Sequence, residues 1–254
     1  MLSKERIEGE LIKIGITPPR IIYYDLIDST NARAKEYAKE MTENRDTVVF
    51  IADSQSAGRG RMGRNFVSNK GAGIYISILS YPKSSGIDAV STTAKAAVAL
   101  AEAVESVCEC DVKIKWVNDL YLGGKKLEGI LTEGEIKKDG KIAYQVVGMG
   151  INVYKNAISD EISAIATSLE GETNSPPDRS ILAARIIKEF LCDEKNYYEE
   201  YKSRSFVIGK KVTVIKQSES YEAEVLDINP DFSLEIDRCE KKERLFTGEI
   251  SLRI

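Results

Sequence analysis

The sequence predicts an α+β protein that ends in a small β-barrel, and two observations support this fold class. Apolar runs of strand length alternate with helical patterns over most of the chain, whereas the final segment holds only short alternating patterns between turn residues. With 254 residues, the chain is long enough for one large domain and a small companion. We therefore expect two domains, at 1–205 and 206–254.

The N-terminal elements follow from apolar runs and capping residues. In order, we expect a strand at 21–24, a helix at 32–41, strands at 47–52 and 74–79, and a helix at 92–107. The segment 28–31, Asp-Ser-Thr-Asn, precedes the first helix, and side chains of these types cap helix N-termini. The same groups could bind a small polar ligand, so capping and ligand binding both stay open.

Residues 112–133 predict two strands around a Gly123-Gly124 turn. Lys126 follows the turn directly, where its side chain either solvates an edge strand or points back into a cleft. Gly129 lies inside the second strand, and glycine in a strand often marks the close approach of a ligand or of another backbone. The turn and the second strand are therefore candidates for a binding site.

The C-terminal part predicts one helix followed by strands. Asp178 caps a helix with an apolar face, and Tyr197, Tyr198 and Tyr201 extend it. Short alternations at 211–215, 221–226, 232–236 and 248–253 then predict the strands of the small barrel.

The segment 58–66, Gly-Arg-Gly-Arg-Met-Gly-Arg-Asn-Phe, places three arginines among three glycines in an acidic chain. Glycine lets the backbone take positive φ and approach a ligand, and arginine offers a planar fork of donors for carboxylate or phosphate oxygens. Arginines beside glycines also occur in ordinary solvated loops, but here core strands lie on both sides. We predict an anion-binding loop; if the segment is extended, Arg59 and Arg61 point the same way.

The same segment matches G-x-G-x-x-G, a pattern typical of dinucleotide binding where a helix starts at the third glycine. Residues 64–71 show no helical period and end in turn formers, so a Rossmann fold is not expected. A protein kinase is excluded as well, because the chain contains no histidine and so lacks the His-Arg-Asp segment.

Composition describes an ordinary globular protein, with 43% hydrophobic and 30% charged residues and a net charge of −4 that argues against a general nucleic-acid surface. Without histidine, no Ser-His or Cys-His nucleophile can form. Catalysis must then rest on lysine, arginine, carboxylates or a metal, which suits the positioning of charged substrates. The four cysteines form no C-x-x-C pair, and the chain shows no signal segment or membrane-spanning run, so we expect a cytoplasmic protein with reduced thiols.

Five stretches, in order, resemble the signature of the biotin–protein ligases. They are 28–31, Gln55 with 58–66, 115–119, 126–133 and 148–152. The resemblance implies a mixed β-sheet flanked by helices, in the class II synthetase-like biotin/lipoate ligase fold, with an SH3-like barrel at the C-terminus. It also implies synthesis of biotinyl-5′-AMP from biotin and magnesium ATP, then transfer of the biotinyl group to a lysine of a biotin carboxyl carrier protein. Biotin and ATP are thus substrates and Mg²⁺ accompanies ATP, while the residues that would hold the metal stay unknown.

The resemblance further assigns site residues. Lys126 and Arg61 are implied to be catalytic, at the reacting carboxylate and α-phosphate, and Asp119 to assist the metal or Lys126. The residues implied to bind biotin are Ser29, Thr30, Asn31, Gln55, Arg59, Gly60, Arg61, Lys126, Gly129 and Leu131. Those implied to bind ATP or the adenylate are Arg59, Arg61, Arg64, Phe66, Asn118 and Asn152. Closure of the segment 58–66, which we call the arginine loop, would exclude the water that hydrolyses an acyl-adenylate.

The chain departs from the family pattern at two positions, with Phe66 where tryptophan is common and Val117 where proline is common. Neither change removes a charge, so we expect activity to survive both. About twenty residues precede the first expected strand, too few for a winged helix-turn-helix, so no DNA binding is expected. The resemblance allows a monomer or a homodimer. A lipoate or octanoate ligase of the same fold and a non-catalytic biotin sensor remain as alternatives.

Overall fold

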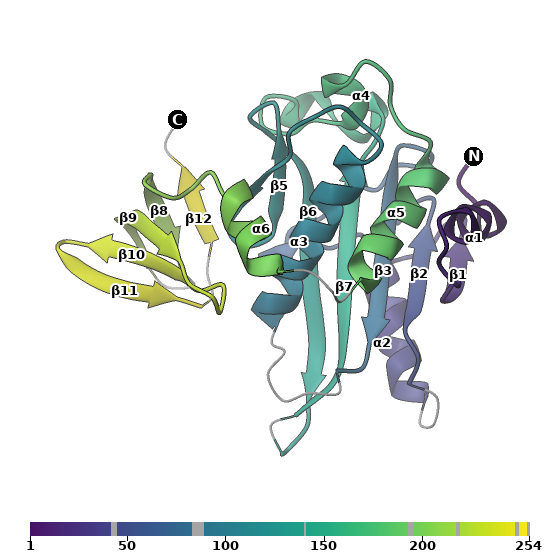
Figure 1. The fold of residues 1–254 in the computed structure, drawn as a ribbon, viewed down its shortest axis with the longest axis horizontal. Helices are drawn as coiled ribbons and strands as arrows, with labels where there is room; N and C mark the ends of the chain where they lie inside the picture. The colour runs from purple at the N-terminus through teal and green to yellow at the C-terminus, as the bar shows by residue number, and fades with distance from the viewer. Residues whose placement is uncertain are drawn as a thin grey trace.

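A mixed seven-stranded sheet forms the centre of the molecule in the computed structural model, which describes residues 1–41, 45–82, 89–139, 141–192, 196–216, 219–246 and 249–252. Its strands are β1 (Arg20–Tyr24), β2 (Val48–Ala52), β3 (Gly73–Ser80), β4 (Lys113–Lys115), β5 (Asp119–Leu122), β6 (Lys125–Ile136) and β7 (Ile142–Asn152). They lie in the order β1-β2-β3-β7-β6-β5-β4 (Figure 1). The β1–β2 pair is parallel and the remaining pairs are antiparallel.

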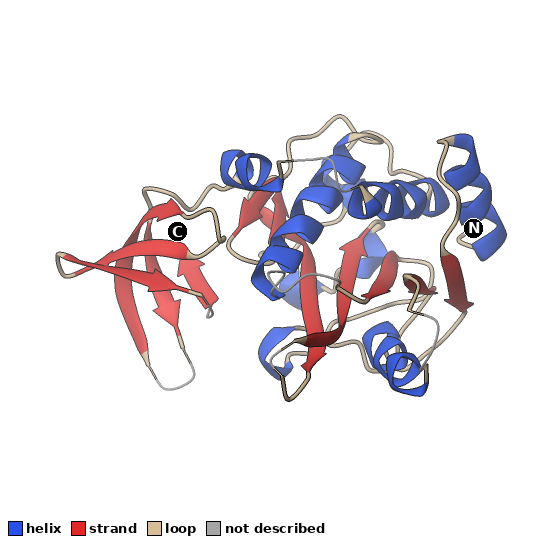
Figure 2. Ribbon diagram, turned by 60° about the horizontal axis from the view of Figure 1, so that its bottom comes forward, coloured by secondary structure: helices blue, strands red, loops and turns tan. Residues whose placement is uncertain are grey.

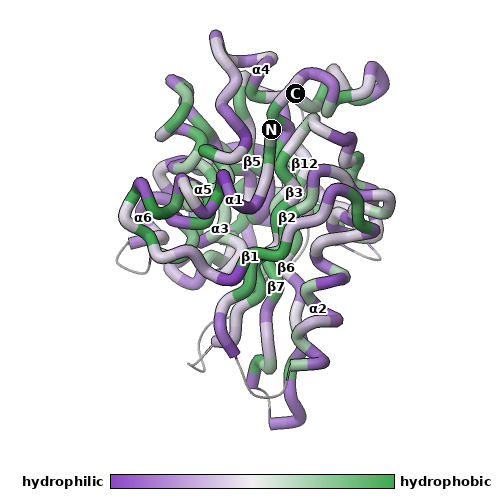
Figure 3. Tube along the Cα trace, turned by 90° about the vertical axis from the view of Figure 1, so that its right-hand side faces the viewer, coloured by the Kyte–Doolittle hydropathy of each residue, from purple (hydrophilic) through white to green (hydrophobic). Residues whose placement is uncertain are grey.

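Helices cover both faces of this sheet. They are α1 (Lys4–Lys13), α2 (Thr30–Glu40), α3 (Ala89–Glu105), α4 (Leu169–Glu172), α5 (Arg179–Leu191) and α6 (Tyr197–Arg204). In Figure 1, α3 and α5 cross in front of the sheet and α2 lies behind it, in agreement with the contacts of α3 with β6 and of α2 with β2, β3 and β7. Hydrophobic residues follow the strands through the middle of the molecule, whereas α2 is largely hydrophilic (Figure 3).

A second, antiparallel sheet of five strands lies beside the first (Figure 2). Its strands are β8 (Lys211–Ile215), β9 (Ser220–Ile228), β10 (Leu234–Arg238), β11 (Lys241–Leu245) and β12 (Glu249–Leu252), in the order β11-β10-β9-β8-β12. Polar contacts join it to the larger sheet region: the indole of Trp116 donates to the carbonyl of Phe232 at 2.8 Å, and the hydroxyl of Tyr198 donates to the carbonyl of Ile228 at 2.9 Å. The ammonium of Lys202 also donates to the carboxylate of Asp227 at 2.8 Å. The α+β class with a small C-terminal β-module is therefore confirmed.

Several predicted elements differ from the structure in local detail. Residues 112–133 form three strands and not two, because the chain turns at 116–118 between β4 and β5. The predicted extension of the C-terminal helix through Tyr201 is wrong, since α5 ends at Leu191 and α6 begins anew, with Asn196 as its N-cap. The strand expected at 232–236 begins later, because Phe232 takes a positive φ of 60° in a turn.

Other elements were not predicted at all, or were predicted with longer bounds. The strands β7 and β11 and the helices α1 and α4 were missed, although Ile7 and Leu11 of α1 show helical i, i+4 spacing and are fully buried. The last expected strand, at 248–253, corresponds to β12; positions 248 and 253 lie outside the described residues.

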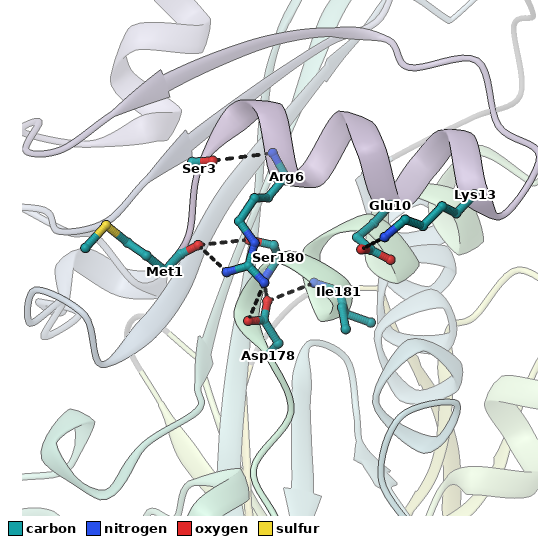
Figure 4. Close-up of polar contacts among 8 residues, drawn as sticks. All are labelled: Met1, Ser3, Arg6, Glu10, Lys13, Asp178, Ser180 and Ile181. Atoms are coloured by element: carbon teal, nitrogen blue, oxygen red, sulfur yellow. Dashed lines mark hydrogen bonds and ion pairs between the residues drawn. The ribbon is translucent and has the colours of Figure 1, made fainter.

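The helix α1 is fastened to the start of α5 by polar contacts (Figure 4). Arg6 donates to a carboxylate oxygen of Asp178 and to the carbonyl of Met1, each at 2.8 Å. Asp178 is also the N-cap of α5 and accepts from the backbone N–H of Ser180 at 2.8 Å. The first residues of the chain thus form part of the helical layer in front of the sheet.

Candidate active site

One large cavity opens beside the sheet, where the β2–β3 loop faces strands β5, β6 and β7. It encloses about 900 Å³ of space, counted out to its open mouth, which is within the range of small-molecule sites. The cavity brings together these residues that the sequence singled out: Ser29, Thr30, Asn31, Gln55, Arg59, Gly60, Arg61, Arg64, Phe66, Asn118, Lys126, Gly129 and Leu131. Segments far apart in the chain therefore share one site.

One end of the cavity is a set of hydrogen-bonded side chains, Thr30, Asn31, Gln55 and Ser77, which we call the polar floor. Gln55 accepts from the backbone N–H of Thr30 at 2.8 Å and from its hydroxyl at 3.1 Å. The hydroxyl of Ser77 lies 2.7 Å from that of Thr30 and 2.6 Å from the amide oxygen of Asn31. Ser77 is fully buried, so the floor holds its donors and acceptors in a fixed arrangement.

Asn31 ties the polar floor to strand β6. Its amide nitrogen donates to the carbonyl of Leu131 at 3.1 Å and to the carboxylate of Glu133 at 2.9 Å. Burial by itself would raise the pKa of Glu133, but hydrogen bonds from Lys35 and Asn31 bring it below its usual value. Glu133 therefore stays ionised and fixes which way the Asn31 amide points.

Two glycines of β7 have no side chain, and side chains of other site residues fill the space beside them. A Cβ at Gly148 would lie 2.2 Å from the amide oxygen of Asn31, and a Cβ at Gly150 would lie 2.6 Å from the ring of Phe66. The Phe66 ring also makes an edge contact with Tyr75, with centroids 6.3 Å apart. These glycines are required by side chains from α2 and from the arginine loop, not by the conformation of their own strand.

The arginine loop folds back on itself. The N–H of Phe66 donates to the carbonyl of Gly58 at 2.9 Å, and the N–H of Gly60 donates to the carbonyl of Arg64 at 2.7 Å. Its tip is a single 3₁₀ turn, η1 (Arg61–Gly63), in which Met62 and Gly63 take positive φ. The loop is thus not extended through Arg61, and no helix follows the third glycine, in agreement with the rejection of a Rossmann site.

The opposite end of the cavity is a chain of polar contacts through Arg61, Asn118, Asp119 and Lys126, which we call the charged end. The guanidinium of Arg61 donates to the amide oxygen of Asn118 at 2.6 Å, and the Asn118 amide nitrogen donates to Asp119 at 2.9 Å. The ammonium of Lys126 lies 2.7 Å from the same oxygen of Asp119. Two cations are thereby held next to each other by one amide and one carboxylate.

The lining of the cavity is strongly positive although the chain is acidic. Its cationic side chains are Arg59, Arg61, Arg64, Lys115 and Lys126, and Asp119 is the only carboxylate among its described lining residues. Such a surplus attracts anions into a confined space. Among the described residues no group of three or more carboxylate and cysteine side chains could hold a metal ion.

Glu128 lies on β6 between Lys126 and Gly129 and was not predicted to matter. It is 1% exposed, and neither carboxyl oxygen has a hydrogen-bond partner among the described residues. Burial, and secondarily the charge of Asp119, raise its pKa well above the usual value, while Lys126 acts in the opposite direction. A buried acid that resists ionisation thus lies next to the charged end.

Asn152 is the one expected site residue that does not line the cavity. Its amide nitrogen donates to the carbonyl of Thr167 at 3.2 Å, at the end of β7. Two lining residues carried no sequence signal that pointed to this site: Tyr75 from β3 and Ile250 from the C-terminal sheet. Their places depend on contacts between distant parts of the chain.

Comparisons with known proteins fit this geometry. Residues 23–152 match the model of the biotin/lipoate A/B protein ligase family. The chain belongs to this family. A bifunctional ligase/repressor, BirA, of Bacillus subtilis is 30% identical to it over 95% of this chain and 76% of its own length. A biotin–[acetyl-CoA-carboxylase] ligase of Mycobacterium tuberculosis is 31% identical over 66% of this chain and 65% of that protein.

A solved structure of biotin protein ligase from Aquifex aeolicus, in complex with biotin and ATP, is similar in fold. It superposes with a TM-score of 0.75 at 28% sequence identity and covers 92% of this chain and 98% of that protein. The resemblance drawn from five short stretches is therefore confirmed as membership of the biotin protein ligases. Within the described residues, no helix is both long enough and apolar enough to cross a membrane.

Proposed function

We propose that this chain activates biotin with magnesium ATP to biotinyl-5′-AMP and transfers the biotinyl group to a lysine of a biotin carboxyl carrier protein. The observation that carries the proposal is one cavity with an uncharged polar floor at one end and a cluster of cations at the other. Such a cavity suits an elongated ligand with a polar ring and a carboxylate. In this reading, residues 1–205 form the catalytic domain and 206–254 a small accessory domain.

The polar floor would hold the ureido ring of biotin, together with Ser29 and the backbone of Gly129 and Leu131. Thr30 and Gln55 bond to each other, so each side chain helps to fix the geometry of the other. A preorganised floor loses little side-chain freedom on binding, which favours affinity.

The charged end would serve the first step. A carboxylate oxygen of biotin attacks the α-phosphorus of ATP, and the bond from that phosphorus to the bridging oxygen breaks as pyrophosphate leaves. Negative charge is concentrated in this transition state, and Lys126 and Arg61 would stabilise it. Asp119 and Asn118 hold the two cations near the reacting atoms until the ligands replace those contacts.

The arginine loop and the aromatic ring of Phe66 would cover the adenylate. Arg59 and Arg64 line the cavity with other residues of the loop, so closure of the loop would keep water from the mixed anhydride. In the second step the neutral amine of the acceptor lysine forms a bond to the acyl carbon. The bond from that carbon to the AMP oxygen breaks, and the amine nitrogen loses a proton to water.

The test is exchange of pyrophosphate into ATP with purified protein and magnesium, comparing biotin, lipoate, octanoate and no acid. Exchange that depends on biotin is the expected result. Exchange with lipoate or octanoate instead would assign the chain to the sister ligases of the same fold, and tight biotin binding without exchange would make it a sensor.

A further inference from the structure

A second cavity, of about 520 Å³, lies against the charged end. Four residues line both spaces: Arg61, Asn118, Ile130 and Leu131. The remaining walls come from the start of α3, from Thr132 of β6, from Val117 and from Phe246, which precedes β12. The two cavities therefore share a boundary at the residues proposed to bind the reacting groups.

The walls of the second cavity suit an alkyl chain and not a charged ligand. Val90, Val117 and Phe246 are apolar, and Arg61 at the boundary is the only charged side chain among the described lining residues. The hydroxyls of Thr93 and Thr132 lie 2.7 Å apart and bond to each other. A triphosphate or a carboxylate would find no partner in this space apart from Arg61.

We propose that the second cavity is the passage through which the acceptor lysine of the partner protein reaches the acyl-adenylate. The inference rests on the proposed function, because it presumes an adenylate beside Arg61 and Lys126. The four methylenes of a lysine would lie along the apolar wall, and the amine would arrive at the boundary. Arg61 stands at that boundary and donates to Asn118; transfer of its guanidinium to the ligand phosphate would open the way.

The same surroundings favour the chemistry of the second step. An ammonium ion cannot attack the acyl carbon, so the lysine must first lose a proton. Apolar walls and a neighbouring guanidinium both disfavour the charged amine. The passage thus delivers the neutral nucleophile, which is the form that reacts.

The experiment narrows the passage from two sides and measures the half-reactions separately. Val90→Trp acts from α3 and Thr132→Phe from β6. Three readouts are taken for each variant: biotin-dependent pyrophosphate exchange, capture of the adenylate by hydroxylamine, and biotin transfer to a purified biotin carboxyl carrier domain. We expect exchange and hydroxylamine capture to stay within about twofold of wild type, while transfer to the carrier domain falls at least about tenfold.

Two controls separate blockage from disruption of the fold. Val90→Ala widens the passage and should leave all three readouts near wild type. Ile12→Trp adds the same indole at a 65% exposed position on α1 and should do likewise.

Unchanged carrier transfer in folded Val90→Trp and Thr132→Phe proteins would overturn the passage. Loss of exchange in both variants would assign the cavity to the nucleotide and overturn it as well. Absence of biotin-dependent exchange in the wild-type protein would instead overturn the proposed function. Without a biotinyl-adenylate, the passage would have no role.

Discussion

The polar floor and the charged end of the same cavity hold their polar groups in different ways. In the floor, Thr30 bonds to both Gln55 and Ser77, and no charge has to move for a ligand to bind. At the charged end, Arg61 and Lys126 are held by Asn118 and Asp119, and a ligand must replace those contacts. The difference teaches that binding of the acid and stabilisation of the reacting phosphate should respond separately to substitution.

Lys126→Ala should give the largest effect and is the sharpest test of that separation. Loss of one group that stabilises transition-state charge lowers kcat about 10²- to 10³-fold. Biotin affinity should fall much less than kcat, because the polar floor is intact. Pyrophosphate exchange measures the first quantity and equilibrium titration with biotin the second.

The neighbouring lysine provides a matched control. Lys125 donates to the carbonyl of Ser163 at 2.8 Å and does not line the cavity. Lys125→Ala should therefore keep wild-type exchange. Equal losses in the two variants would show that the turn, and not the ammonium of Lys126, is what matters.

Gly148→Ala should disturb the polar floor and leave the charged end intact. Its Cβ would lie 2.2 Å from the amide oxygen of Asn31 and would force that side chain out of the polar floor. A buried polar group that loses its partners costs about 1–3 kcal/mol, so biotin should bind about ten- to a hundredfold more weakly. Titration with biotin is the measurement, and kcat at saturating biotin should fall less than affinity does.

Gly9→Ala is the control for this substitution. Gly9 lies within α1, and an added Cβ there has nothing within 4 Å. Alanine in a helix should leave biotin binding unchanged and stabilise the fold slightly. If Gly148→Ala also binds biotin like wild type, Asn31 is not fixed in the way the floor requires.

The sequence predicted the residues that line the cavity better than it predicted strand β7, which supports them. Residue type and spacing singled out residues such as Arg61, Lys126 and Gly129, and these residues line the cavity. Strand β7 was missed because its glycines at 148 and 150 weaken any local strand pattern. The reason for those glycines lies in Asn31 and Phe66, which are distant in sequence and adjacent in space.

Residues such as Ile250 and Glu128 show where sequence reasoning stops. Ile250 reaches the cavity because the C-terminal sheet packs beside Trp116, a contact that no local pattern encodes. Glu128 looks like an ordinary polar position of an alternating strand, yet it is buried. Only the packing of the layers above the strand decides that.

Glu128→Gln should show that the buried carboxyl of Glu128, next to the charged end, lowers the stability of the fold. The polar floor should carry no such cost, because its groups are hydrogen-bonded. The folded pKa of Glu128 is raised above its usual 4.5, so its contribution to stability is fully present below about pH 4.5 and lost as pH rises through the folded value. The glutamine variant has no such loss. Its melting temperature should match wild type near pH 4.5 and exceed it by a few degrees at pH 8.

The measurement is a series of melting curves of wild type and Glu128→Gln at several pH values. Leu131→Val or another apolar change would alter packing at every pH, whereas the effect at Glu128 must grow with pH. A constant difference between Glu128→Gln and wild type would show that the carboxyl is ionised, or neutral, in folded and unfolded chains alike.

Trp116→Phe should give the smallest effect and tests whether the charged end depends on the C-terminal sheet. The Trp116 indole donates to the carbonyl of Phe232 at 2.8 Å and belongs to the turn that carries Asn118. Loss of one such hydrogen bond costs about 1 kcal/mol, equivalent to about 2–4 °C in melting temperature for a chain of this size, and the smaller ring adds a packing loss at this buried position. KM for ATP should rise while biotin affinity stays constant, because only the charged end is loosened.

Tyr198→Phe distinguishes that role from simple attachment of the two sheets. The Tyr198 hydroxyl donates to the carbonyl of Ile228 at 2.9 Å and joins α6, and not the turn, to the C-terminal sheet. It should lower the melting temperature by a similar amount and leave KM for ATP unchanged. If both variants raise KM equally, the C-terminal sheet acts on ATP through its overall position; if neither does, the turn at Asn118 is held by the larger sheet alone.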